Sequence, residues 1–360
     1  MKMDGLEGFV AAETVLSDVD GERGRLIIRG MTLDQIAGRK SYEEVLALLL
    51  QGLVDVPQET AALREALGRA RRALAAHLPA IDEALAALAP ADALRALIAR
   101  LPDGEDVQTA LRLLAAPAVF TPALMRLREG KRPIEPDESL GHAADMLRMM
   151  NATPPNAAQA AALDAYLVTV CDHGLNASTF AARVVASTGS GLTSAVVAGL
   201  GALKGPLHGG APGPVLDMLD AVGRPQDAAS WVEQALAGGQ RLMGFGHRIY
   251  RVRDPRADAL RTALDRLAQV GAVDEKRLRL AEAVEAAALA ALRRRKPQRR
   301  LETNVEFYTA LLLEALGIPR SAFTCIFAAG RVGGWIAHAR EQRLSGRLIR
   351  PQSTYLGPLP

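Results

Sequence analysis

The chain has 360 residues, a formal net charge of +3 and an apolar fraction of 49%. This is the composition of an ordinary soluble globular protein, and the length leaves room for two domains rather than one. The slightly basic balance suits anionic small molecules such as carboxylates or phosphates, but gives no support to nucleic-acid binding.

The two cysteines, Cys171 and Cys325, lie far apart and lack the paired spacings of a zinc site or a disulfide framework. We expect them to be reduced and buried in a cytoplasmic protein. The N-terminal stretch MKMDGLEGFVAAET has acidic residues where a signal peptide needs a continuous apolar run, so no export signal is expected.

Apolar residues recur mainly at the helical period of 3.6, which predicts a mostly helical fold. One brief exception is GRLIIRG, residues 24–30. Ser41 and Glu44 form a capping box ahead of VLALLLQG, and Gly52 is a plausible stop for that helix.

Residues 58–100 predict two helices rich in Ala, Leu and Arg, separated at His77 and Pro79. Residues 184–203 form an uncharged stretch about long enough to span a bilayer. Serine, threonine and glycine interrupt it, so we expect a pair of buried helices and no membrane span.

Three helices with clear boundaries follow residue 254. The first has Asp254 as its cap, Pro255 at its first position and Gly271 as its stop. The other two are expected at about residues 274–295 and 304–317.

Three histidines sit beside glycines in short motifs: His173 in DHGLNAS, His208 in GPLHGG and His247 in GFGHRIY. Glycine allows a sharp turn and a close backbone approach, so these imidazoles are candidates for a ligand cleft. For any one of them, a solvated turn or a helix cap is the simpler explanation. His142 and His338 fall inside helical patterns, where packing or surface roles are expected.

Arg256 falls in the first turn of a predicted helix, where a cation opposes the helix dipole. An anion that the guanidinium grips through two hydrogen bonds explains it better, although a solvated arginine remains the alternative. His208 precedes a predicted helix, whose N-terminus favours a neutral imidazole that can donate to a developing enolate. No metal-binding spacing accompanies the histidines.

The chain also resembles a known family over nearly its whole length, through ALKGPLHGGA, GFGHRIYRVRDPRA, NVEFYTALLLEALGIP, FAAGRVGGWIAHAREQ and LIRPQSTYLG. These motifs resemble those of citrate synthases of the shorter bacterial type. The resemblance implies an all-α fold with a large domain, residues 1–209 and 319–360, and a smaller inserted domain, residues 210–318, with the active site in the cleft between them.

The resemblance implies condensation of acetyl-CoA with oxaloacetate to give citrate and free coenzyme A. His208 would stabilise the enol of the thioester, His247 would polarise the ketone and Glu306 would be the base. The other implied site residues bind substrates: His173, Arg256, Phe327, Arg331 and Arg350 for oxaloacetate, and Arg251 for a phosphate of coenzyme A.

Arg350 would come from the neighbouring subunit of a homodimer. The resemblance implies no metal and no tightly bound cofactor, since the coenzyme A thioester is a substrate. The run RRRKPQRR, residues 293–300, is most simply a solvated helix end, with steering of coenzyme A phosphates as the functional alternative. No reader motif or interleaved aromatic residue supports nucleic-acid binding.

Two positions depart from the family pattern. Gly174 stands where the family usually has glutamate, and Glu306 stands where it typically has aspartate as the base. Glutamate has a similar ordinary pKa, but its extra methylene moves the carboxylate. Thr303 and Glu306 also match a T-x-x-E capping box, in which Glu306 would be a weaker base with a depressed pKa.

Three alternatives therefore stay open. The nearest is the same chemistry on propionyl-CoA, as in 2-methylcitrate synthases, which share these motifs. The second, from another class, is a binding paralogue with weak or no turnover. A metalloprotein is the least supported.

Overall fold

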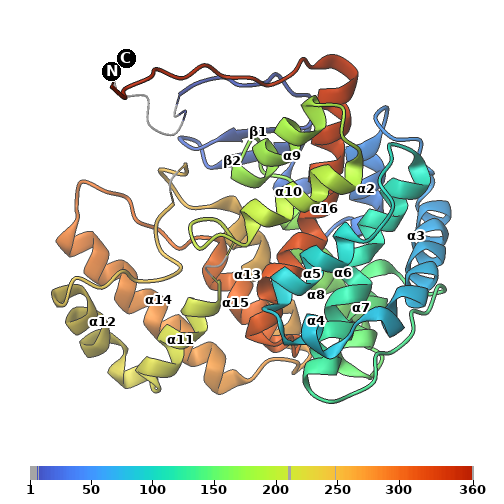
Figure 1. The fold of residues 1–360 in the computed structure, drawn as a ribbon. Coiled ribbons are helices and arrows are strands. Elements are labelled where there is room, and N and C mark those ends of the chain that lie inside the picture. Colours follow the sequence, from blue (N-terminus) through green and yellow to red (C-terminus); the bar gives the residue numbers. More distant parts are fainter. Residues whose placement is uncertain (1–5, 7, 210–211, 248, 359–360) are drawn as a thin grey trace.

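The computed structural model describes residues 6, 8–209, 212–247 and 249–358. Helices make up most of these residues, and the few strands form a single small sheet (Figure 1). The prediction of a mostly helical protein is confirmed.

The strands are β1 (Ser17–Asp20), β2 (Arg25–Ile28) and β3 (Met31–Thr32). The first α-helices are α1 (Leu33–Ile36), α2 (Tyr42–Leu50), α3 (Thr60–Leu74), α4 (Glu83–Ala87), α5 (Pro90–Ala99), α6 (Val107–Arg128), α7 (His142–Asn151) and α8 (Ala157–Val170). The later α-helices are α9 (Ala177–Ser187), α10 (Leu192–Leu203), α11 (Pro212–Val222), α12 (Ala228–Ala237), α13 (Pro255–Gln269), α14 (Glu275–Arg295), α15 (Val305–Ala315) and α16 (Phe323–Ser345). Three short 3₁₀ turns are η1 (Ala75–Ala80), η2 (Pro225–Asp227) and η3 (Arg320–Ala322).

The predicted exception to helix, residues 24–30, contains the central strand of the sheet. β2 pairs antiparallel with both β1 and β3, with Ser17 opposite Ile28 and Ile28 opposite Met31. The alternate residues Leu26 and Ile28 are buried. This sheet therefore packs one face against the helical body.

Helix α16 is the centre of the core, where it contacts α2, α6, α8, α9 and α10. Glycines lie where neighbouring helices come closest to α16, because a larger side chain would not fit there. A Cβ atom on Gly330 would lie 2.4 Å from Val170 Cγ2, and one on Gly199 of α10 would lie 2.8 Å from the Trp335 ring. Close packing of this helix matters because α16 also carries Arg331 towards the interior.

Helix α6 is long and apolar enough to cross a membrane, but 83% of its apolar window is buried inside the protein. That burial is typical of the core helix of a globular fold. The uncharged residues 184–203 span the end of α9, the turn that follows it and all of α10, which packs against α9, so the predicted helix pair is confirmed. Cys171 and Cys325 are free and buried, as expected.

Most predicted helix boundaries are confirmed. The Ser41–Glu44 capping box is formed, Asp254 caps α13, and Gly271 has a left-handed φ of +69° just after that helix. The prediction of only two helices in residues 58–100 is wrong. Asp82 caps α4 and Pro90 is the first residue of α5, so two separate helices begin after α3 where one was predicted.

Helices α11, α12 and α14 lie together on one side of the molecule, away from α3 and α7 (Figure 1). They belong to the segment predicted as a smaller domain. The domain boundaries at residues 209/210 and 318/319 stay a prediction.

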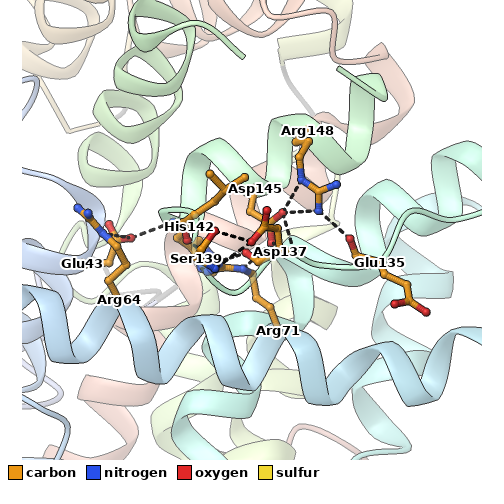
Figure 2. A network of polar contacts seen from close by, with 10 residues as sticks. Glu43, Arg64, Arg71, Glu135, Asp137, Ser139, His142, Asp145 and Arg148 are labelled. Carbon is orange, nitrogen blue, oxygen red and sulfur yellow. Dashed lines mark hydrogen bonds and ion pairs between the residues drawn. The ribbon is translucent and has the colours of Figure 1, made fainter. Parts of the chain in front are cut away.

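A buried ion-pair network ties α3 to α7 and to the loop that precedes α7 (Figure 2). The Arg71 and Asp145 side chains are both 0% exposed, and Arg71 Nε donates to Asp145 Oδ2 at 2.9 Å. Arg71 Nη2 also donates to the Leu140 carbonyl, and Arg148 donates to Asp145 Oδ1. The two buried charges therefore compensate each other and also satisfy backbone groups.

We predict that Asp145→Asn destabilises the protein by about 3–5 kcal/mol, because the Arg71 charge would stay buried without its partner. Chemical denaturation measures the change. The control is Asp92→Asn, which weakens the solvent-accessible pair with Lys204 and should change the free energy of unfolding little. Equal effects of the two variants would contradict the assignment.

Candidate active site

A cleft of about 1160 Å³ collects eight of the nine predicted site residues. It exceeds the ~300–1,000 Å³ of common small-molecule pockets, so it has room for two substrates. The residues of the site that line it are His173, His208, His247, Arg251, Arg256, Glu306, Phe327 and Arg331. Arg350 lies in the exposed segment after α16 and does not line this cleft, so its role in a partner's site stays a prediction.

The protonation of His247 follows from its backbone contacts. Its Nδ1 accepts hydrogen bonds from the N–H groups of Ile249 and Tyr250 at 3.1 and 3.0 Å. Burial, aided by the Arg256 charge, lowers the pKa of His247 to about 4, so the ring is neutral at pH 7. A neutral ring with Nδ1 as acceptor carries its proton on Nε2.

His247 Nε2 lies 3.1 Å from Arg256 Nη2, which is also a donor. Two donors pointing at one another do not satisfy each other. Both can donate to one acceptor oxygen that lies beside them in the cleft, at hydrogen-bond distance from each nitrogen. The geometry therefore favours a ligand with a carbonyl or carboxylate oxygen at this point.

Arg256 already has a partner within the protein. Its Nε and Nη2 donate to the two oxygens of Asp254, the cap of α13, at 3.0 and 2.8 Å. The expectation that Arg256 needs an external anion is therefore incomplete, because Asp254 compensates part of its charge. Asp254 Oδ2 also accepts the N–H of Val305 at 3.2 Å, which joins the N-termini of α13 and α15.

Arg331 has no such partner. Its side chain is 1% exposed, its Nε donates to the Val170 carbonyl at 2.6 Å, and no ion pair links it to a carboxylate in the described part of the chain. Burial lowers the pKa of Arg331 to about 10, and the charge of buried Asp172 opposes that fall, so Arg331 is charged at pH 7. Its guanidinium carbon lies 4.9 Å from the centre of the Phe327 ring. The cleft thus contains a buried cation that an anionic ligand can compensate.

His208 contacts the N-terminus of α9. Its Nε2 lies 2.9 Å from Ser178 Oγ and faces the Ser178 N–H at 3.4 Å. Burial, reinforced by the Arg331 charge, lowers the pKa of His208 to about 4. A neutral His208 near a helix N-terminus was predicted, although the helix it contacts is α9. Ser178, which also accepts from Trp335 Nε1, was missed because only the fold brings it to His208.

Glu306 lies in the first turn of α15, but it does not form the capping box with Thr303 that the sequence allowed. The cap of α15 is Asn304, whose Oδ1 accepts the Glu306 N–H at 3.0 Å, whereas the Thr303 hydroxyl donates to Glu285. Burial raises the pKa of Glu306, and the nearby guanidinium of Arg256 opposes that rise. Glu306 is therefore a stronger base than the capping alternative implied.

Backbone bonds hold the His247 segment against the start of α15. Asn304 N–H donates to the Gly244 carbonyl at 2.9 Å, and Gly246 N–H donates to the Glu302 carbonyl at 2.8 Å. Asn304 Nδ2 donates to the Gly246 carbonyl at 2.8 Å. The segments that carry His247 and Glu306 are thus held in one fixed arrangement.

His173 is buried, and its Nε2 lies 3.1 Å from the hydroxyl of Tyr250, a residue that the sequence analysis missed. Burial, with the charges of Arg256 and Arg331, holds the pKa of His173 well below its usual range. Gly174 has a left-handed φ of +59°, and its N–H donates to Ser17 Oγ at 3.0 Å. Glycine fits this conformation, so the departure at Gly174 leaves the local backbone satisfied.

Arg251 is exposed at the mouth of the cleft, 3.9 Å from Glu22. In the basic run 293–300, Arg294 and Arg295 pair with Glu233, and Arg293 pairs with Glu302. These three arginines form the exposed C-terminal turn of α14, as predicted for a solvated helix end. Among the described residues, no group of three His, Cys, Asp or Glu side chains is arranged to bind a metal ion.

Known proteins are similar to this chain in both sequence and fold. A family model described as "Citrate synthase, C-terminal domain" matches residues 5–352. The chain is 40% identical over 373 residues to a citrate synthase of Haloferax volcanii, covering 98% of this chain and 95% of that protein. It is 35% identical over 361 residues to a 2-methylcitrate synthase of Mycobacterium tuberculosis, covering 98% and 90%.

The fold matches a solved ternary complex of carboxymethyl coenzyme A and oxaloacetate with citrate synthase from Thermoplasma acidophilum. The TM-score is 0.87 at 27% identity, and the match covers 99% of this chain and 97% of that one. The implied two-domain helical fold is therefore confirmed at the level of the whole chain. This chain is an enzyme that belongs to the citrate synthase family.

Proposed function

We propose that this chain condenses acetyl-CoA with oxaloacetate and releases citrate and free coenzyme A. The observation that carries the proposal is the convergence of donors in the cleft. His247 Nε2–H and Arg256 Nη2 are adjacent donors that one acceptor oxygen could satisfy, and Arg331 supplies a buried positive charge without a direct ion pair to a carboxylate among the described residues. An anionic oxo acid offers the acceptor oxygens that such a site requires.

Oxaloacetate fits these groups because it is a dianion with a ketone. Arg331 and Arg256 bind its carboxylates together with His173, and His247 donates to the ketone oxygen. Polarisation of that ketone makes its carbon electrophilic. The ordered contacts of His247 mean that little reorganisation is needed when substrate binds.

The thioester is activated by Glu306 and His208. Glu306 removes a proton from the methyl group, and His208 donates a hydrogen bond to the oxygen that becomes enolic. Because His208 Nε2 faces the N–H of Ser178, the proton of the neutral ring is assigned to Nδ1, which is then the donor. The raised pKa of Glu306 suits its role as base.

The enol carbon then attacks the ketone carbon, the thioester C=O re-forms and any proton shared with the enol oxygen returns to His208. The ketone oxygen takes the proton of His247 Nε2 and becomes the hydroxyl of the citryl thioester, and the proton that Glu306 removed returns through solvent to restore His247. Water hydrolyses that thioester: its oxygen binds the acyl carbon, the C–S bond breaks and the sulfur leaves as the thiol of coenzyme A. These steps use the chain's own acids and bases, and the proposal includes no tightly bound cofactor. Arg251 at the cleft mouth would contact a phosphate of coenzyme A.

The working unit in this proposal is a cytoplasmic homodimer in which Arg350 of one subunit completes the oxaloacetate site of the other. Exposure of Arg350 outside its own cleft is compatible with such a role. A second candidate reaction uses propionyl-CoA, since one relative is named 2-methylcitrate synthase. Comparison of kcat/KM for the two thioesters decides between them.

We predict that Glu306→Gln lowers kcat by about 10²–10⁴-fold, because the amide cannot accept the methyl proton. Release of free thiol, followed with acetyl-CoA and oxaloacetate, measures the rate. Oxaloacetate affinity, measured by calorimetry, should change little.

The matched control is Glu302→Gln, which removes a carboxylate paired with exposed Arg293 and should keep the wild-type rate. Full activity of Glu306→Gln would remove Glu306 as the base. Wild-type protein that binds oxaloacetate but releases no thiol would instead support the inactive binding paralogue.

The pH dependence of kcat/KM should follow Glu306. The base works when it is deprotonated, and its pKa is raised, so activity should fall as the pH drops through a value above 4.5. His208 and His247 have lower pKa values of about 4, so they protonate at a lower pH than Glu306. An acid limb centred at or below 4.5 would contradict the described environment of Glu306.

A further inference from the structure

We propose that Tyr250 is a positioning residue that fixes the orientation of His173 and His247 for binding of the oxo acid. The inference rests on the proposed function, because it assigns both imidazoles to that substrate. Tyr250 itself is 2% exposed and does not line the cleft, so it acts through the two histidines.

Tyr250 contacts His247 in two ways. Its backbone N–H donates to His247 Nδ1 at 3.0 Å, which helps to keep the His247 proton on Nε2. Its ring also packs on the His247 ring, with centroids 4.9 Å apart. The backbone contact is independent of the Tyr250 side chain, whereas the ring contact depends on it.

The hydroxyl of Tyr250 reaches the second imidazole. It lies 3.1 Å from His173 Nε2, and the two rings meet edge to face at 5.6 Å. The guanidinium carbon of Arg256 lies 5.7 Å from the centre of the Tyr250 ring. Tyr250 therefore contacts three of the groups that bind the oxo acid.

In this proposal the contact with the Tyr250 hydroxyl determines which nitrogen of His173 carries the proton. That nitrogen is the one that can donate to the substrate. Burial raises the pKa of Tyr250, so the phenol keeps its proton, and His173 is neutral because its own pKa is lowered. A carboxylate only accepts hydrogen bonds, so His173 must offer it an N–H. A Tyr250 hydroxyl that donates to Nε2 leaves that N–H on Nδ1.

The turn between β1 and β2, which also lines the cleft, contacts the backbone of the Tyr250 segment. Arg251 N–H donates to the Gly21 carbonyl at 2.8 Å. A Cβ atom on Gly21 would lie only 2.3 Å from the Ile249 carbonyl oxygen, so the two backbones are in direct contact there. This contact restrains the backbone on both sides of Tyr250.

The test is Tyr250→Phe, which keeps the ring and removes only the hydroxyl. We expect the KM and the calorimetric Kd for oxaloacetate to rise about tenfold, as for loss of one hydrogen bond. Both kcat and the KM for acetyl-CoA should stay within about twofold, because phenylalanine keeps the ring and backbone contacts to His247, and Glu306 and His208 are untouched. In ¹⁵N NMR spectra, the His173 signals should shift towards a different tautomer ratio.

The matched control is Tyr308→Phe. It also removes a buried hydroxyl, which donates to Glu285 Oε2 at 2.7 Å outside the cleft, so oxaloacetate binding should not change. An unchanged or lower Kd in Tyr250→Phe would overturn the inference, as would an equal rise in both variants. Wild-type protein that neither binds nor turns over oxaloacetate would refute the proposed function itself, and with it this inference.

Discussion

The structure depends on one electrostatic constraint, a buried guanidinium with no carboxylate partner among the described residues. Arg331 sits in the cleft almost fully shielded from water, and its Nε donates to a backbone carbonyl. The charge of buried Asp172 compensates it in part, without a direct ion pair between the two side chains. A buried charge that forms no direct ion pair opposes folding. An anionic substrate would compensate the Arg331 charge. The buried arginine would then lower the stability of the free protein but increase its affinity for the substrate.

The rest of the fold holds the reacting groups around that charge. Helix α16 carries Arg331 into the core, where Gly330 of α16 allows close packing with α8 and Gly199 of α10 allows close packing on Trp335. Asp254 joins the starts of α13 and α15, while Asn304 joins α15 to the His247 segment. Arg256, Glu306 and His247 therefore come from different parts of the sequence but share one set of backbone and capping bonds.

The sequence predicted what local rules determine. Asp254, Pro255 and Gly271 marked α13 correctly, and glycine-flanked His173, His208 and His247 do meet in one cleft. It did not predict contacts that exist only after folding, such as Tyr250 with His173 or Ser178 with His208. The Thr303 capping box failed for a physical reason: Thr303 and Asn304 are both good caps, and the fold uses the Thr303 hydroxyl to satisfy buried Glu285.

The most direct test of this account is to measure the oxaloacetate affinity and the unfolding midpoint of Arg331→Met together. Methionine has a similar volume and no charge, so the account predicts at least about a hundredfold loss of affinity with an unchanged or raised midpoint. Wild-type affinity in this variant would contradict the account. So would a markedly lower midpoint, because it would show that Arg331 serves the fold rather than the substrate.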